Sequence, residues 1–229
     1  MKVGIMQPYF LPYIGYWQLI EAVDTFVILD DVNYINRGWI NRNIIKVANT
    51  QKWITVPING ASQNKLICDL GIKEDLGWRE KMLKTIKHSY RSEINFQPTY
   101  ELFEEIMVEC SGNLSKFLHK SIIAMCESLC IKTKIIASSR IYPKGNLRGA
   151  SRIIDICKRL EATEYINLTN GSKLYNYDQF KESNITLHIM KEHGTMGGQS
   201  NNRPSRKTYS ILHTLMYEKV DKQFLLENH

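Results

Sequence analysis

The chain has 229 residues, a formal net charge of +7 and a hydrophobic fraction of 43%. That length suits a single domain with a sizeable core, and the absence of a run of about 18 apolar residues argues against a membrane-spanning helix. Pro8 and Pro12 interrupt the N-terminal apolar segment, so we expect no signal-peptide core and a cytoplasmic protein.

The charged residues and the cysteines limit the classes of partner. The positive charge suits an anionic ligand such as a nucleotide, a phosphosugar or RNA, but the basic residues are scattered and do not choose among these. The five cysteines lack the paired spacing of a zinc site. We therefore expect reduced, mostly buried cysteines and no metal site.

Short apolar runs alternate with helical patterns along most of the chain. This alternation predicts an α/β fold with a mostly parallel, Rossmann-like sheet. The expected strands are residues 3–6, 25–29, 134–137, 164–168 and 185–190, and the expected helices are 13–23, 151–160, 178–182 and 205–220.

The segment between the second and third of these strands differs in pattern. Residues 43–48 and 52–58 flank a short polar stretch and predict a hairpin. Residues 78–130 are helical throughout, with Pro98 in the first turn of a second helix and a further helix starting near residues 111–113. We thus expect one α/β domain over residues 1–229, with a helical subdomain at 78–130 and a mobile loop at 191–207.

Polar and aromatic side chains follow the first predicted strand, where ligands bind in open α/β sheets. Gln7 can both donate and accept hydrogen bonds. Tyr9, Tyr13 and Tyr16 can form a stacking wall for a base or sugar ring, although core packing explains single aromatics equally well. Gly15 permits close approach of a phosphate to the helix start, or simply a tight turn.

Asp30 and Asp31 follow the second predicted strand. If the strand continues through them, their side chains lie on opposite faces and at most one faces the site. That carboxylate can act as general base, hold Mg²⁺ or bind a ribose hydroxyl.

Further candidate residues lie beyond these acids. Arg37 and Arg42 suit phosphate, and Asn33, Trp39 and Asn41 lie among them, while surface ion pairs are the alternative for the arginines. His88 is a candidate catalytic residue, although lone histidines are usually structural or solvated. The remaining candidates follow later strands: Ser138, Ser139, Asn167 and Asn170.

Two long segments resemble the WbqC-like protein family: Met6-Gln-Pro-Tyr-Phe-Leu-Pro-Tyr-Ile-Gly-Tyr16 and Asp30-Asp-Val-Asn-Tyr-Ile-Asn-Arg-Gly-Trp-Ile-Asn-Arg-Asn43. Residues 152–166 and 209–216 are similar to that family as well. The resemblance implies a bacterial surface-polysaccharide protein, such as one from an O-antigen cluster, that transfers glycine or another amino acid onto an amino sugar. The chain departs from the family pattern at residues 146–151 and at His213.

A weaker resemblance links the first strand, loop and helix to nucleotidylyltransferases and pantothenate synthetase. Those enzymes carry a His-x-Gly-His motif on this loop to bind ATP phosphates. Here Tyr13 and Tyr16 flank Gly15 instead, and tyrosine carries no positive charge at neutral pH.

The first functional hypothesis is an aminoacyl transferase or ligase. It would form an amide on the amino group of a nucleotide-linked deoxyamino sugar, using either a free amino acid with ATP and Mg²⁺ or an aminoacyl-tRNA. The alternatives are a non-catalytic nucleotide- or RNA-binding protein and a nucleotidylyltransferase. No Walker loop, nucleophile elbow or zinc signature is present in the sequence.

Overall fold

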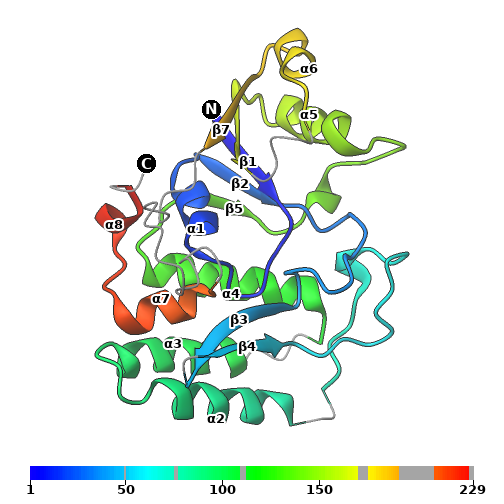
Figure 1. Ribbon diagram of the computed structural model, residues 1–229. Helices are drawn as coiled ribbons and strands as arrows, with labels where there is room; N and C mark the ends of the chain where they lie inside the picture. The colour runs from blue at the N-terminus through cyan, green and yellow to red at the C-terminus, as the bar shows by residue number, and fades with distance from the viewer. Residues whose placement is uncertain (49, 75–76, 109–111, 170–174, 191–208, 227–229) are drawn as a thin grey trace.

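A five-stranded parallel sheet forms the centre of the molecule (Figure 1). The computed structural model describes residues 1–48, 50–74, 77–108, 112–169, 175–190 and 209–226. The strands are β1 (Lys2–Met6), β2 (Thr25–Ile28), β5 (Lys134–Ile136), β6 (Glu164–Leu168) and β7 (Thr186–Met190). Their spatial order is β5-β2-β1-β6-β7. The predicted parallel, Rossmann-like α/β architecture is confirmed.

The order of the strands is that of a doubly wound sheet. The chain moves outward from β1 through β2 to β5, then crosses back to β6 on the other side of β1 and continues to β7. The direction of winding therefore reverses between β1 and β6. In such sheets the crevice beyond the carboxyl ends of the two strands at the reversal is the usual ligand site.

Alternate residues of the sheet enter separate hydrophobic clusters on its two faces, as strand geometry requires. Val3 and Ile5 of β1 pack with residues of α5 (Gly149–Arg159) and α6 (Tyr177–Glu182). Phe26 and Ile28 of β2 pack on the opposite face, beside α1 (Ile14–Glu21). Helices on both faces explain why the strands read as continuous apolar runs rather than alternating ones.

A hairpin and three helices occupy the segment between β2 and β5. The hairpin pairs β3 (Arg42–Val47) with β4 (Thr50–Thr55), and the helices are α2 (Trp78–Tyr90), α3 (Phe96–Val108) and α4 (Leu114–Ser128). Pro98 lies in the first turn of α3, and the Asn113 side chain caps α4 by accepting from the Lys116 amide at 3.0 Å. Phe117 of α4 shares one cluster with Phe26 of β2, so the core is continuous from the sheet into these helices. The division into a separate helical subdomain stays a prediction.

The C-terminal part differs from the single predicted helix over residues 205–220. In the described part of the chain, α7 (Ile211–Tyr217) ends where Glu218 adopts extended backbone, and a second helix, α8 (Lys222–Leu226), follows. Two short 3-10 turns, η1 (Ile67–Asp69) and η2 (Ser139–Ile141), complete the described elements. The predicted mobile loop at 191–207 lies outside the described residues. Across the described ranges, no helix has both the length and the apolar character to cross a membrane.

Candidate functional site

The loop after β1 begins at the carboxyl end of that strand and is held by hydrogen bonds to its backbone carbonyls. The Tyr16 hydroxyl donates to the Gln7 carbonyl at 3.1 Å, and the Trp17 indole donates to the Pro12 carbonyl at 3.0 Å. Asn43 at the start of the hairpin donates from its side-chain amide to the carbonyls of Phe10 and Leu11, at 3.0 and 2.7 Å. The sequence therefore fixes the path of this loop through amides and aromatic donors.

Burial separates the predicted tyrosines into two groups. Tyr16 is 0% exposed, and its ring packs edge-on against Phe26 with 5.4 Å between centroids. The stacking role predicted for Tyr16 is therefore wrong, because a ring without exposed surface cannot cover a ligand. Tyr9 and Tyr13 are only half-buried. Gly15 lies buried in the first turn of α1.

Polar groups of the β6 segment lie across the reversal point from this loop. The Asn167 amide donates to the Tyr165 hydroxyl at 3.0 Å, and Tyr165 donates to the Ile5 carbonyl of β1 at 3.3 Å. The Tyr175 hydroxyl lies 3.3 Å from that of Tyr165. This chain of phenols and amide ties the carboxyl ends of β1 and β6 together.

The phenol groups of Tyr9, after β1, and Tyr175, after β6, lie close enough to interact electrostatically. Burial raises the pKa of Tyr9, and the neighbouring Tyr175 phenol raises it further. Burial also raises the pKa of Tyr175. Both phenols therefore keep their protons at neutral pH and can donate hydrogen bonds to a ligand.

The double aspartate lies at the carboxyl end of β2, beside the end of β5. Asp30 is 2% exposed, and its carboxylate accepts from the hydroxyls of Ser115 and Ser138, both at 2.6 Å. The Ser139 amide donates to it as well, at 3.2 Å. The structure thus brings Asp30, Ser138 and Ser139 together, as adjacent parallel strands predict.

Asp31 is also buried and faces the same serine. It is 4% exposed and accepts from the Ser139 hydroxyl at 2.5 Å and from the Arg152 guanidinium at 2.7 Å. The same Ser139 oxygen accepts from the backbone amides of Asp30 and Asp31 at 3.2 and 3.3 Å. Because β2 ends at Ile28, the strand does not continue through the acids, and they do not lie on opposite faces.

The hydrogen bonding of the two acids bears on their predicted chemistry. Every carboxylate oxygen of the pair accepts a hydrogen bond from within the protein. Both acids are also almost completely buried, at 2% and 4% exposed, which leaves little surface through which either could accept a substrate proton. This geometry favours a role in fixing the edge of the sheet, and the catalytic role of Asp30 or Asp31 stays a prediction.

The turn between β2 and β3 holds most of the remaining candidates, and several of them are engaged within it. Asn41 accepts from the Tyr34 hydroxyl and donates to the Val56 carbonyl, both at 2.8 Å. Arg42 donates to the carbonyls of Gly38 and Arg37, and its guanidinium carbon lies 4.0 Å from the centre of the Trp53 ring. These contacts give Asn41 and Arg42 a part in shaping the turn.

Three other candidates of this turn are exposed. The Asn33 amide donates to the Gln63 carbonyl at 2.8 Å. Arg37 has a left-handed backbone with φ 59°, and among the described residues its guanidinium forms no ion pair. Trp39 is 41% exposed and lies 5.2 Å from Trp53 between ring centroids. Its carbonyl accepts from the Phe10 amide at 3.3 Å, which places this turn next to the loop after β1.

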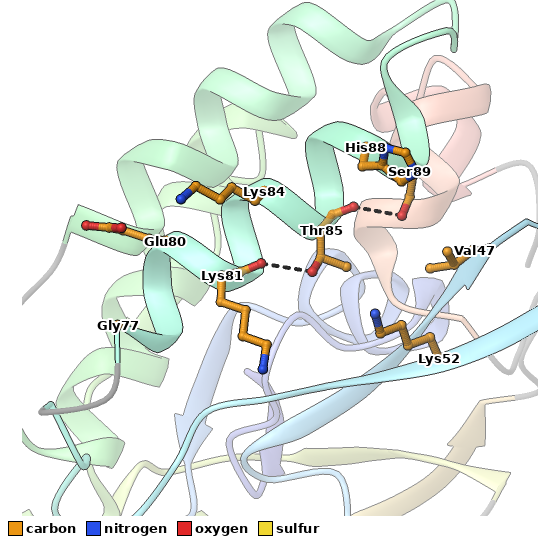
Figure 2. A pocket seen from close by; sticks show the side chains of 9 residues that line it. All are labelled: Val47, Lys52, Gly77, Glu80, Lys81, Lys84, Thr85, His88 and Ser89. Carbon is orange, nitrogen blue, oxygen red and sulfur yellow. Dashed lines mark hydrogen bonds between the residues drawn. The ribbon is translucent and has the colours of Figure 1, made fainter.

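His88 does not join these groups at the edge of the sheet. It lies on α2 and lines a groove between that helix and the β3–β4 hairpin (Figure 2). Asn170 lies outside the described residues. Within the described ranges, no three His, Cys, Asp or Glu side chains gather as a metal site requires.

The structure adds residues that sequence reasoning missed. Arg152 and Ser115 complete the aspartate network, and the buried Tyr165 connects Tyr175 to β1. Arg152 is the first residue of the third segment that resembles the WbqC-like family, and this resemblance could have identified it as a candidate. Ser115 carries no such signal, because it reaches Asp30 from a helix 85 residues away in sequence.

Comparisons with known proteins identify a relative and a family of this chain. An uncharacterized protein of Mycobacterium tuberculosis, Rv1507c, is 29% identical over 187 residues, which span 81% of this chain and 80% of that protein. No solved structure matches the chain significantly. The sequence profile of the WbqC-like protein family matches residues 7–223, which include the loop after β1, the double aspartate and Arg152. The chain belongs to the WbqC-like protein family.

Proposed function

We propose that this protein is an enzyme that forms an amide on the amino group of a nucleotide-linked deoxyamino sugar, for use in surface polysaccharides. The observation that carries the proposal is that polar side chains follow both strands at the reversal of the sheet, where the Tyr9 and Tyr175 phenols interact electrostatically. Gln7 and Tyr9 flank this point from the β1 side, and Asn167 and Tyr175 flank it from the β6 side. Amides and phenols that retain their protons suit the hydroxyls and ring of a sugar.

The proposed reaction is attack of the sugar amine on an activated acyl carbon. A carbon–nitrogen bond forms, the bond from the acyl carbon to its leaving oxygen breaks, and the nitrogen loses one proton. The acyl donor is an aminoacyl adenylate made from ATP or an aminoacyl-tRNA. Tyr9 is the proposed donor to the oxyanion that develops on the acyl carbonyl, since its phenol is only half-buried and carries its proton at neutral pH.

Other residues take supporting roles in this proposal. Asp30, Asp31 and Arg152 hold the ends of β2 and β5 in register, which positions the edge of the crevice. Arg37 is the proposed phosphate contact, because its guanidinium is exposed while that of Arg42 is bound to the turn. A planar guanidinium matches the geometry of a phosphate group.

The test is a turnover assay with the purified protein. It is incubated with dTDP-, UDP- or GDP-linked amino sugars, and with either glycine plus ATP and Mg²⁺ or glycyl-tRNA. Mass spectrometry then looks for a sugar nucleotide heavier by one glycyl residue. Release of AMP with free glycine identifies the adenylate route, and product with glycyl-tRNA alone identifies the tRNA route. Failure of both routes with every sugar, for glycine and for a mixture of the other amino acids, contradicts the proposal.

A second candidate is a non-catalytic nucleotide- or RNA-binding protein. The exposed Trp39 and Trp53 rings, with Arg42 over Trp53, favour it, because bases stack on such surfaces. Binding of RNA without turnover of any sugar nucleotide would make it the better assignment. The nucleotidylyltransferase alternative is less well supported, since the position of a phosphate-binding histidine is taken by Tyr16, which is buried.

A further inference from the structure

A groove separate from the crevice lies between α2 and the β3–β4 hairpin, and it has two connected chambers. One has a volume of about 440 Å³ and is lined by Lys52, Lys81, Lys84 and His88, among others. The other has a volume of about 360 Å³ and is lined by Trp53, Pro57, Trp78 and Met82, among others. Lys52, Lys81 and Thr85 line both chambers, so the two are continuous. Volumes of this size are typical of small-molecule sites.

Positive charge from two different elements converges on the basic chamber. Figure 2 shows Lys81 reaching from α2 toward the hairpin and Lys52 reaching from β4 toward α2. Lys84 lies one turn along the same helix, and Glu80 is the acid of this lining. Among the described residues, none of the three lysines forms an ion pair. The ammonium groups of Lys52 and Lys81 point into the space between α2 and the hairpin and repel each other, and an anion bound between them removes that repulsion.

The second chamber offers an aromatic wall instead of charge. Trp53 is 43% exposed, and the Arg42 guanidinium lies 4.0 Å from its ring centre. Pro57 and Met82 add apolar surface beside it. An exposed indole with an apolar surround is suited to stacking by a planar ring. Charge and stacking surface thus lie side by side in one groove.

Two hydroxyl groups line the groove: that of Thr85 borders both chambers, and that of Ser89 borders the basic chamber. The Thr85 hydroxyl donates to the Lys81 carbonyl at 2.8 Å, and the Ser89 hydroxyl donates to the Thr85 carbonyl at 2.7 Å (Figure 2). Each hydroxyl hydrogen is thereby used within the helix, and each oxygen keeps acceptor capacity. Such acceptors suit the hydroxyls of a ribose.

We propose that this groove is a second binding site, for a free nucleoside diphosphate. The phosphates bind Lys52 and Lys81, the ribose lies at Thr85, and the base stacks on Trp53. A small nucleotide fits better than a nucleic acid strand, because the basic residues of this chain form no continuous stripe and the volumes are those of a small molecule. The proposal does not depend on the amide-forming reaction.

Isothermal titration of the intact protein with metal-free ADP tests the site. Wild-type protein is expected to bind ADP, and the double variant Lys52→Gln/Lys81→Gln is expected to bind it at least about tenfold more weakly, since charged hydrogen bonds are lost. Lys132→Gln removes one exposed lysine elsewhere and is the matched control, with unchanged affinity expected. Melting temperatures measured for each variant confirm that it is folded.

The variant Trp53→Leu distinguishes the contribution of the aromatic chamber to binding from that of the basic chamber. It is expected to weaken binding of ADP but not of inorganic pyrophosphate, whereas the lysine double variant weakens both. Equal ADP affinity in wild type and the double variant would overturn the site. So would a single-stranded RNA 12-mer that binds much more tightly than ADP, because it would identify a strand-binding surface.

A third outcome distinguishes this site from the crevice. Loss of ADP binding in Tyr9→Ala, with full binding in the lysine double variant, would place the nucleotide at the end of β1. That result would overturn the groove while leaving the proposed amide-forming function intact. Conversely, absence of amide product with lysine-dependent ADP binding would contradict the function and support the groove.

Discussion

The guanidinium of Arg152 lies 2.7 Å from the carboxylate of Asp31, and both side chains are almost completely buried. The same guanidinium nitrogen donates to the carbonyls of Ser139 and Tyr142, at 2.9 and 2.8 Å. Arg152 therefore joins α5 to the ends of β2 and β5 through one charged group. This contact has a direct consequence for stability.

Replacing Arg152 with methionine is expected to destabilise the protein by about 3–5 kcal/mol, because it leaves a buried, uncompensated carboxylate. Urea unfolding followed by circular dichroism measures the change. Arg159→Met is the control, since Arg159 forms a partly exposed pair with Asp155 and pairs near the surface contribute about 0–1 kcal/mol. Equal effects of the two substitutions would show that the buried pair does not hold this edge.

Ser139→Ala is expected to destabilise the protein more than Ser138→Ala. The Ser139 hydroxyl donates to Asp31 and accepts from two backbone amides, whereas Ser138 donates to Asp30 and accepts from the Arg140 amide. Each unsatisfied buried group costs about 1–3 kcal/mol. Unfolding midpoints of both variants in one denaturant series provide the comparison. A larger loss for Ser138→Ala would contradict the central position of Ser139.

The sequence predicted most of this edge and not all of it. Ser138 and Asp30 follow apolar runs, and runs that form neighbouring parallel strands end at the same edge, so their meeting was foreseeable. The contribution of Ser115 was not, because no periodicity tells which helix of a long insertion packs on which strand. Long-range packing of this kind is set by tertiary structure rather than by local pattern.

The burial of Tyr16 was equally hard to foresee. Residues 14–20 of α1 are all buried, so this short helix has no polar face by which periodicity could separate core from site. The last predicted helix was extended to residue 220, past the end of α7 at Tyr217, for a related reason, since the apolar spacing continues across the extended residue Glu218. In both places the local pattern predicted a helix correctly, but it did not predict which residues are buried or where the helix ends.

His213 makes stability depend on pH. Burial lowers its pKa to about 4, and Lys46 acts in the same direction. The Tyr90 hydroxyl lies 3.0 Å from its Nδ1, and Tyr209 and Tyr217 pack against the ring. In the unfolded chain a histidine has a pKa of about 6.5. Below that pH the unfolded state takes up a proton that the folded state refuses until pH approaches 4, so the stability is present above about 6.5 and is lost as pH falls.

His213→Phe is therefore expected to flatten the acid side of the stability profile. The melting temperature of wild-type protein should fall more between pH 7 and pH 4.5 than that of the variant. Differential scanning calorimetry at matched ionic strength measures both. Parallel profiles would show that His213 is not the group that takes up the proton.

The variant Arg37→Gly tests the strain of the Arg37 backbone and the role of its side chain with two different measurements. A left-handed backbone costs a non-glycine residue about 1–2 kcal/mol, so glycine at φ 59° is expected to keep or raise the melting temperature. If Arg37 contacts phosphate, the same variant binds a sugar nucleotide several-fold more weakly. Calorimetric titration and thermal unfolding of one preparation provide both values. Unchanged binding would remove Arg37 from the site.

The most direct test of the crevice is ligand-induced stabilisation, because a ligand that binds only the folded state raises its melting temperature. Wild-type protein, Tyr9→Ala and Gln7→Ala are heated with dTDP-, UDP- and GDP-linked amino sugars, with Tyr217→Ala as an exposed tyrosine control. At least one sugar nucleotide should stabilise wild type and the control, and the shift should shrink in Tyr9→Ala and Gln7→Ala. No stabilisation by any of them, or equal shifts in all four proteins, would contradict a ligand site between the ends of β1 and β6.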